Sequence, residues 1–246
     1  MFVPFDVSVI LLVFVVSFIG ASLQGNIGFG LGPLSVPILA MIDTAYVPGP
    51  LLLSALLLNL LIYRRERHAV IKQDLYWAVL GRFLGTMLGA YFLTIFPSAH
   101  IKLYLALMVL LAIALSVSGI RITPKAGNLF LAGNLSGFMG TTSSIGGAPM
   151  ALLYQHNKGP RIRGTLSVVF TFGVIIALIS LAVIGKFGLY ELKLAATLLP
   201  GVYLGYRLSN LTKNILDRGY MRPAVLIASA VFALILSAPY WYPLFG

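Results

Sequence analysis

Ten apolar segments run through the whole chain, and the longest of them are long enough to cross a lipid bilayer. A transmembrane helix needs about 20 apolar residues to span roughly 30 Å of hydrocarbon. Hydrophobic residues make up 59% of the 246 residues and charged residues only 9%, which is too little charge for the surface of a soluble protein. The sequence therefore predicts a single membrane domain over residues 1–246 with an all-α fold, a polytopic bundle of transmembrane helices. The segments cover about Val7 to Leu23, Leu34 to Ile42, Leu51 to Tyr63, Leu75 to Phe96, Ile101 to Ile120, Asn128 to Met139, Pro149 to Gln155, Gly164 to Ile184, Leu189 to Leu208 and Ala224 to Ala238.

Basic residues give the chain a net charge of +11, and they lie mainly in the short connectors between apolar segments. Arg64, Arg65 and Arg67 share one connector, which the positive-inside rule places in the cytoplasm. Counting back from this connector places Asp43 and the N-terminus outside. We therefore expect a multi-pass protein of the cell membrane, the inner membrane of a bacterium, and no binding of nucleic acid despite the high positive charge.

The residue types needed for metal binding or catalysis are scarce in this sequence. The chain has no cysteine, which excludes disulfides and thiolate metal sites. It also lacks an HExxH motif, a pair of carboxylates within one apolar segment, and a serine with an obvious general base. We expect no metal ion, no cofactor and no enzymatic activity.

Two glycine-rich stretches interrupt the apolar pattern at matching places. "GNIGFGLGP" at residues 25–33 aligns with "TTSSIGGAP" at residues 141–149, and "GRFLG" at 81–85 aligns with "GVYLG" at 201–205. A short apolar piece follows each stretch, and Leu34 to Ile42 would reach only about 13 Å as a helix, which is half a span. The sequence thus predicts two repeats, residues 7–120 and 126–240, each a broken helical hairpin followed by three spanning helices.

The two predicted repeats have opposite orientations in the membrane. The first broken hairpin enters and leaves from the outer face, whereas Lys125 and Lys158 flank the second one on the cytoplasmic side. Inverted repeats with discontinuous helices are a recurring architecture of secondary transporters, whose binding site lies near the membrane midplane where the breaks meet.

A break inside the membrane exposes backbone groups that need a partner. We expect Pro33 and Pro149 at the first helical position of the two short helices, so that both N-termini point inward and favour an anion. Glycines allow close approach of the backbone to a ligand, and neighbouring neutral side chains supply donors. The predicted substrate-binding residues are Gln24, Asn26, Gly28, Gly30, Gly32, Pro33, Asn59, Arg82, Thr141, Thr142, Ser143, Ser144, Gly146, Gly147 and Pro149.

Several of these residues have a second interpretation. Arg82 either neutralises the anion or extends back to the cytoplasmic face. Asn59 either contacts the cargo or forms a hydrogen bond between helices. "GFG" also occurs in potassium filters, but the second break lacks it. We assign helix packing to the glycines of the spanning segments, namely Gly81, Gly85, Gly89, Gly201 and Gly205.

Three stretches of the chain, "GFGLGPLSVPIL", "SSIGGAPMALL" and "LLPGVYLGYRL", resemble the TauE/SafE family of membrane transporters, and the resemblance spans nearly the whole chain. Phe29 and Leu31 interrupt the denser glycine run of the family pattern, which leaves open which of the two breaks binds more closely. The resemblance implies transport of a sulfur oxyanion such as sulfite, or of an organosulfonate.

Together these features predict a secondary transporter that moves a small sulfur-containing anion by alternating access, with the anion held at helix N-termini near the midplane. The alternative is an anion channel with the same site. The expected partners are the small anionic substrate and the lipid bilayer. A homodimer is compatible with the sequence, although no residue specifies one.

Overall fold

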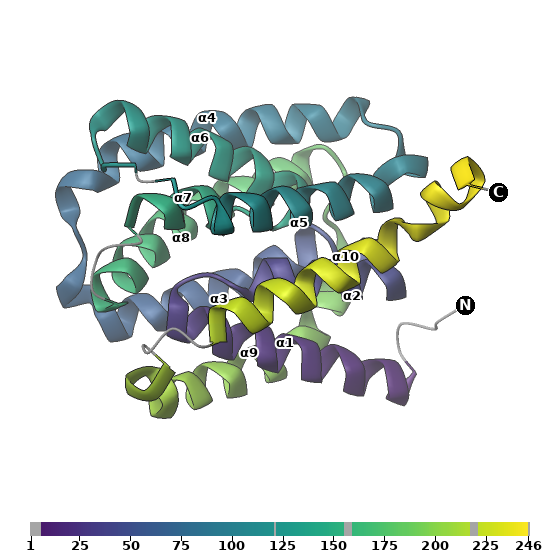
Figure 1. The fold of residues 1–246 in the computed structure, drawn as a ribbon, viewed down its shortest axis with the longest axis horizontal. Helices are drawn as coiled ribbons and strands as arrows, with labels where there is room; N and C mark the ends of the chain where they lie inside the picture. Colours follow the sequence, from purple (N-terminus) through teal and green to yellow (C-terminus); the bar gives the residue numbers. More distant parts are fainter. Residues whose placement is uncertain (1–5, 121, 155–158, 217–220, 246) are drawn as a thin grey trace.

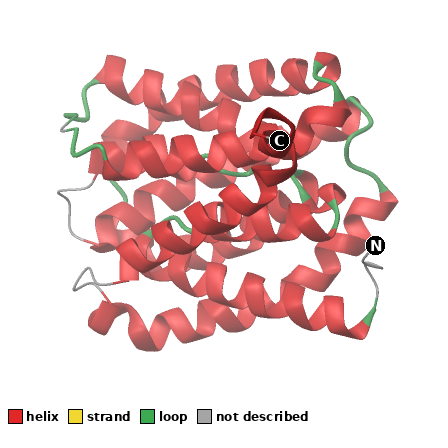
Figure 2. Ribbon diagram, turned by 45° about the vertical axis from the view of Figure 1, so that its right-hand side comes forward, coloured by secondary structure: helices red, strands yellow, loops and turns green. Residues whose placement is uncertain are grey.

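The computed structural model describes residues 6–120, 122–154, 159–216 and 221–245, with side chains described outside 213–225 and 241–246. Within these ranges all regular structure is helical (Figure 2), which confirms the predicted fold class. Lys158 and Gln155 lie outside the described residues. The helices are α1 (Val7–Ile27), α2 (Leu31–Ile42), η1 (Thr44–Tyr46), α3 (Gly49–Glu66), η2 (Arg67–Ala69), α4 (Lys72–Ile95), η3 (Ser98–His100), α5 (Ile101–Val117), α6 (Ala126–Ser143), α7 (Gly147–Tyr154), α8 (Gly159–Val183), α9 (Leu189–Leu216) and α10 (Met221–Phe245).

Five helical stretches in the described part of the chain are long and apolar enough to cross a membrane. They are Val7–Ile27, Thr44–Ala69, Lys72–Ile95, Ser98–Val117 and Gly159–Val183, and two shorter apolar helices are Leu31–Ile42 and Leu226–Tyr240. Many large apolar side chains on these helices face outward, where a bilayer would cover them. The protein is therefore a multi-pass helical membrane protein.

Both predicted breaks are present, but each is shorter than the glycine-rich stretch that predicts it. α1 continues to Ile27 and α2 begins at Leu31, so the first break consists of residues 28–30. In the second half the interruption lies between Ser143 and Gly147. Gly28 and Gly30 have φ angles of 94° and 144°, which a residue with a side chain rarely adopts.

The positions of the two prolines differ from the expectation. α2 begins at Leu31 and α7 at Gly147, so Pro33 and Pro149 each occupy the third helical position and the expected first position is wrong. The third position is still in the first turn, where the backbone N–H has no partner within the helix. A proline there loses no helical hydrogen bond, so a helix that begins two residues before it is not disrupted.

Equivalent helices of the two halves pack against equivalent partners. α1 packs along α9 as α6 packs along α4, α2 contacts α10 as α7 contacts α5, and α3 lies against α8. α1 begins at the end of the molecule where the N-terminus lies, and α6 begins at the opposite end (Figure 1). This pattern is the one that two inverted repeats would produce, while the residue boundaries 7–120 and 126–240 stay a prediction.

Small residues allow the long helices of the two halves to approach closely. A Cβ atom at Gly81 or Gly85 would overlap the backbone of α6, and one at Gly201 or Gly205 would overlap α1. These contacts confirm the packing role of the glycines. "GRFLG" lies in α4 and faces α6, and "GVYLG" lies in α9 and faces α1. Each motif therefore lies in the fourth helix of one half and packs against the first helix of the other half, which explains why the two motifs align.

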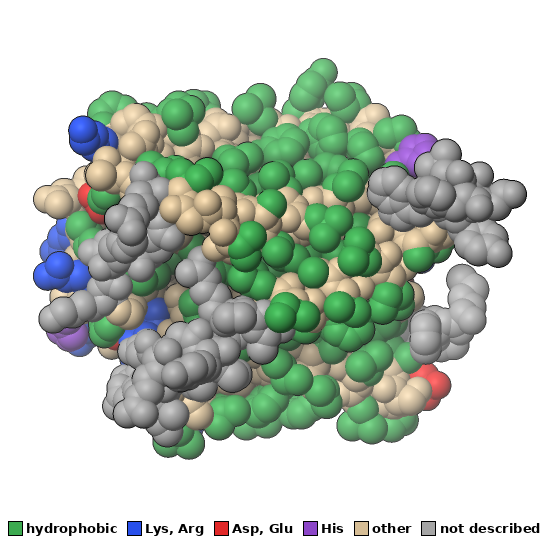
Figure 3. All heavy atoms as spheres, viewed as in Figure 1, with side chains coloured by type: hydrophobic (Ala, Val, Ile, Leu, Met, Phe, Trp, Pro, Cys, Tyr) green, Lys and Arg blue, Asp and Glu red, His purple; other side chains and the backbone are tan. Residues whose placement is uncertain are grey.

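Lys and Arg side chains gather at one end of the molecule on the face drawn in Figure 3, opposite to the end where both termini lie. Arg64, Arg65 and Arg67 belong to this basic end, at the connection from α3 to α4. The positive-inside rule would place it in the cytoplasm. An outside N-terminus stays a prediction.

Candidate functional site

The two breaks touch each other in the interior of the bundle. A Cβ atom at Gly32 would overlap the carbonyl oxygen of Ser144, and a Cβ atom at Gly147 would lie 2.7 Å from the Cβ of Phe29. Only glycine allows the backbones to come this close. The predicted convergence of the breaks is therefore confirmed, and the first turns of α2 and α7 begin beside each other.

A half-buried arginine, Arg65, and a buried one, Arg163, bind the end of α1 just before the first break. Arg65 donates from Nη2 to the carbonyl of Gly25, and Arg163 donates from Nη1 to the carbonyl of Asn26 at 2.8 Å. The Nε atoms of both arginines lie 3.0 and 3.1 Å from the same Oε1 atom of Glu66. Cations at the negative end of a helix dipole satisfy its last carbonyls. This is the physical reason why α1 continues through Gly25 and Asn26, where the glycine-rich sequence predicts an interruption.

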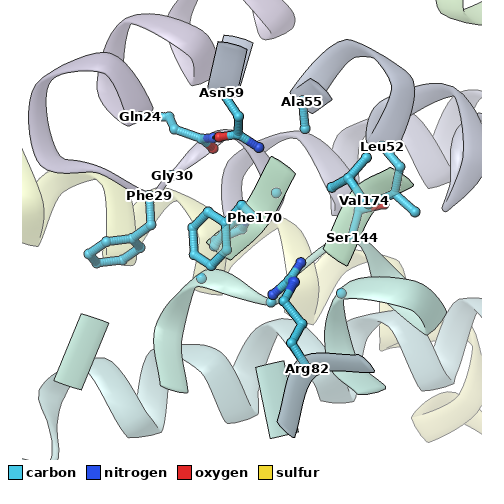
Figure 4. A pocket seen from close by; sticks show the side chains of 15 residues that line it. Gln24, Phe29, Gly30, Leu52, Ala55, Asn59, Arg82, Ser144, Phe170 and Val174 are labelled. Atoms are coloured by element: carbon cyan, nitrogen blue, oxygen red, sulfur yellow. The ribbon is translucent and has the colours of Figure 1, made fainter. Parts of the chain in front are cut away.

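A small cavity of about 40 Å³ lies where the two breaks meet (Figure 4). A water molecule needs about 10 to 15 Å³ on this measure, so the cavity accommodates about three water-sized groups. Nine of the predicted substrate-binding residues line it: Gln24, Gly30, Gly32, Pro33, Asn59, Arg82, Ser144, Gly146 and Gly147.

Gln24 and Asn59 form a paired amide wall on the α1–α3 side of the cavity. Gln24 Nε2 donates to Asn59 Oδ1 at 3.0 Å, and Gln24 Oε1 accepts the backbone N–H of Leu31 at 3.3 Å. Gln24 thereby caps the first residue of α2. Asn59 is 2% exposed and has its amide in the cavity wall, so it both joins helices and reaches the candidate site.

Arg82 enters the cavity from the opposite wall. Its side chain is 4% exposed although it lies ten residues, about 15 Å, along α4 from the basic end. The guanidinium lies 4.8 Å from the ring centroid of Phe170, and Nη1 donates to Ser136 Oγ. The interpretation that Arg82 extends back to the cytoplasmic face is wrong.

The charge of Arg82 has no counter-ion in the described part of the chain. Both ion pairs found there join arginines to Glu66 at the end of α1. The Nε atom of Arg82 is buried and has no hydrogen-bond partner. A buried cation without a counter-ion is costly, so an anion in the cavity would lower its free energy.

Three glycines from three segments surround the Arg82 guanidinium. A Cβ atom at Gly140 would lie 3.1 Å from Nη2, one at Gly146 would lie 3.1 Å from Nη1, and one at Gly173 would overlap Nε. The Arg82 side chain therefore fills space that side chains on α6, the second break and α8 would otherwise occupy. This crowding fixes the guanidinium on the cavity wall.

Six predicted site residues do not line the cavity. Thr142 Oγ1 bonds to Tyr104 and to the Phe138 carbonyl, and Ser143 Oγ bonds to the Met139 carbonyl. Asn26 bonds to the Ser22 carbonyl and to Thr212. The remaining three are Gly28, Thr141 and Pro149.

Sequence reasoning missed several residues around Arg82. Phe29, Phe170 and Val174 supply apolar walls, and Ser136 connects Arg82 to the carbonyl of Gly146. Apolar wall residues give no signal in a chain as apolar as this one. Ser136 lies four residues before Gly140, and this spacing of small residues on one face of α6 was the available clue.

Comparison with known protein families gives a match over most of the chain. A family model described as Sulfite exporter TauE/SafE matches residues 12–236, nearly the whole chain. Searches of curated proteins and of solved structures gave no significant match.

Proposed function

Because the chain belongs to the TauE/SafE family, whose members transport sulfur anions across membranes, we propose that it carries a small sulfur oxyanion or organosulfonate through the cavity between its two breaks. The cargo binds the Arg82 guanidinium, the amide wall of Gln24 and Asn59, and the N-terminal backbone of α2 and α7. The buried guanidinium without a counter-ion in the described residues is the observation that carries this proposal.

The size of the cavity and the burial of the side chains around it support a small cargo and alternating access. A volume of about 40 Å³ suits an ion with three oxygens such as sulfite, or the headgroup of a short sulfonate. Gln24, Asn59, Arg82 and Phe170 are all less than 7% exposed. This burial supports a carrier in which cargo reaches the site after part of the wall moves.

Counterflow in proteoliposomes tests the proposal. Vesicles loaded with unlabelled sulfite or methanesulfonate should accumulate the labelled anion transiently above equilibrium, because a carrier exchanges one bound anion for another. A channel gives no such exchange, and that outcome would favour the alternative function.

A pair of glycine variants connects this activity to the cavity. A Cβ atom at Gly146 would overlap the Ser136 carbonyl and crowd Arg82, whereas one at Gly127 would meet nothing within 4 Å. Gly146→Ala should abolish counterflow at normal membrane levels, and Gly127→Ala should retain it. Equal activity of the two variants would exclude the second break from the transport site.

A further inference from the structure

A groove on the outer surface of the bundle combines an apolar wall with two cations. It has a volume of about 430 Å³, within the range of ordinary ligand pockets, and lies between α3, α4 and α8. Its apolar wall includes Leu60, Tyr63, Leu75 and Phe172, and Arg67 and Lys72 lie at its basic end. It is separate from the transport cavity, with which it shares no lining residue.

The two cations of the groove are exposed, while the acids next to them in sequence are turned inward. Glu66 is 8% exposed and binds Arg65 and Arg163, and Asp74 is 6% exposed and accepts a hydrogen bond from Tyr154 at 3.0 Å. Arg67 has a long contact of 3.4 Å to His68. No ion pair of Arg67 or Lys72 occurs within the described ranges. The basic end of the groove therefore has a positive surface that a negative group can approach.

The groove has cations at one end and apolar side chains along the rest, as a phospholipid has a charged headgroup followed by acyl chains. Arg67 lies near the end of one candidate span, Thr44–Ala69, and Lys72 is the first residue of the next, Lys72–Ile95. The ends of spanning helices lie near the depth of lipid headgroups. Leu60 lies seven residues before Arg67, about 10 Å deeper along α3. A headgroup phosphate at the cations would thus place an acyl chain against the apolar wall.

We propose that this groove binds one anionic phospholipid, with its phosphate at Arg67 and Lys72 and an acyl chain along Leu60, Leu75 and Phe172. Basic side chains near a membrane surface attract anionic lipids with an energy that corresponds to about fivefold in affinity for each cation. The apolar wall adds contact that a soluble anion cannot make, so the ligand is a membrane lipid.

Native mass spectrometry of the purified, delipidated protein tests the proposal with two lipids of identical acyl chains, phosphatidylglycerol and phosphatidylcholine. The wild-type protein should retain one phosphatidylglycerol more strongly than phosphatidylcholine. The double variant R67Q/K72Q should weaken this binding by about thirtyfold. R64Q/R207Q removes the same charge from exposed residues that do not line the groove, and it should bind like the wild type.

A second variant tests the apolar wall. Thr171 lines the groove, and T171W should fill it and displace the retained lipid while leaving both cations in place. Equal retention of the two lipids by the wild-type protein, or equal weakening in both double variants, would overturn the proposal. Loss of a dimer in T171W, with no lipid bound to the wild type, would also overturn it and would assign the groove to a second copy of the chain.

Discussion

Replacing Arg82 with glutamine should separate the binding role of this side chain from a structural one. Arg82 is buried, donates to Ser136 Oγ through Nη1, and has no hydrogen-bond partner for Nε. A hydrogen bond from a charged donor contributes about 1.5 to 3 kcal/mol. If the anion accepts the Nε proton, Arg82→Gln should raise its dissociation constant by roughly 10- to 150-fold.

The same substitution should leave the folded protein about as stable as before, or slightly more stable. No carboxylate in the described chain pairs with Arg82, so no buried charge is left alone when the guanidinium is removed. Ser136 keeps its hydrogen bond to the Gly146 carbonyl. The loss should therefore appear in anion affinity and not in thermal unfolding.

Titration calorimetry with sulfite and methanesulfonate, together with the half-saturation concentration of counterflow, measures the first effect. Thermal unfolding in detergent, followed by size-exclusion chromatography, measures the second. A lower unfolding temperature with unchanged affinity per folded molecule would refute the reasoning, because Arg82 would then stabilise the fold without touching the cargo.

Two further predictions concern the neighbours of this site. Gly173→Ala should displace the Arg82 guanidinium, because the new Cβ would overlap its Nε atom. Anion binding, measured by calorimetry, should weaken by at least tenfold although Arg82 itself is retained. An unaltered affinity would contradict this geometry. Arg163→Gln should lower the free energy of unfolding by about 2 kcal/mol, because Glu66 and the Asn26 carbonyl each lose a buried partner. The anion affinity of the folded protein should change little. Thermal unfolding measures the loss of stability, and an unchanged midpoint would show that Arg65 alone holds the end of α1.

The membrane fold and the breaks were predictable because they depend on strong local signals. Long apolar segments predict spanning helices, and the dense glycine run before Pro33 predicts an interrupted helix. The paired motifs beginning at Gly81 and Gly201 also predicted equivalent packing. These features depend on residues close together in the sequence, so a single chain is enough to see them.

The ends of the helices and the environment of Arg82 were not predictable in the same way. α1 extends to Ile27 because Arg65 and Arg163, which come from α3 and α8, bind its last carbonyls. The sequence places Arg65 in a connector and gives no sign that it turns inward. Likewise, the position of Arg82 depends on Gly173, which is 91 residues away in the chain. Contacts between distant segments decide both features.

The lone charge of Arg82 determines which step of the proposed cycle responds to membrane voltage. Since no carboxylate in the described chain compensates it, the empty site carries one positive charge, and the site filled with a monovalent anion carries none. Moving one full charge across 100 mV changes the free energy by about 2.3 kcal/mol. In the proposed cycle a negative cell interior would draw the empty site inward and leave the filled site unaffected, so that the resting potential would favour expulsion of a monovalent anion.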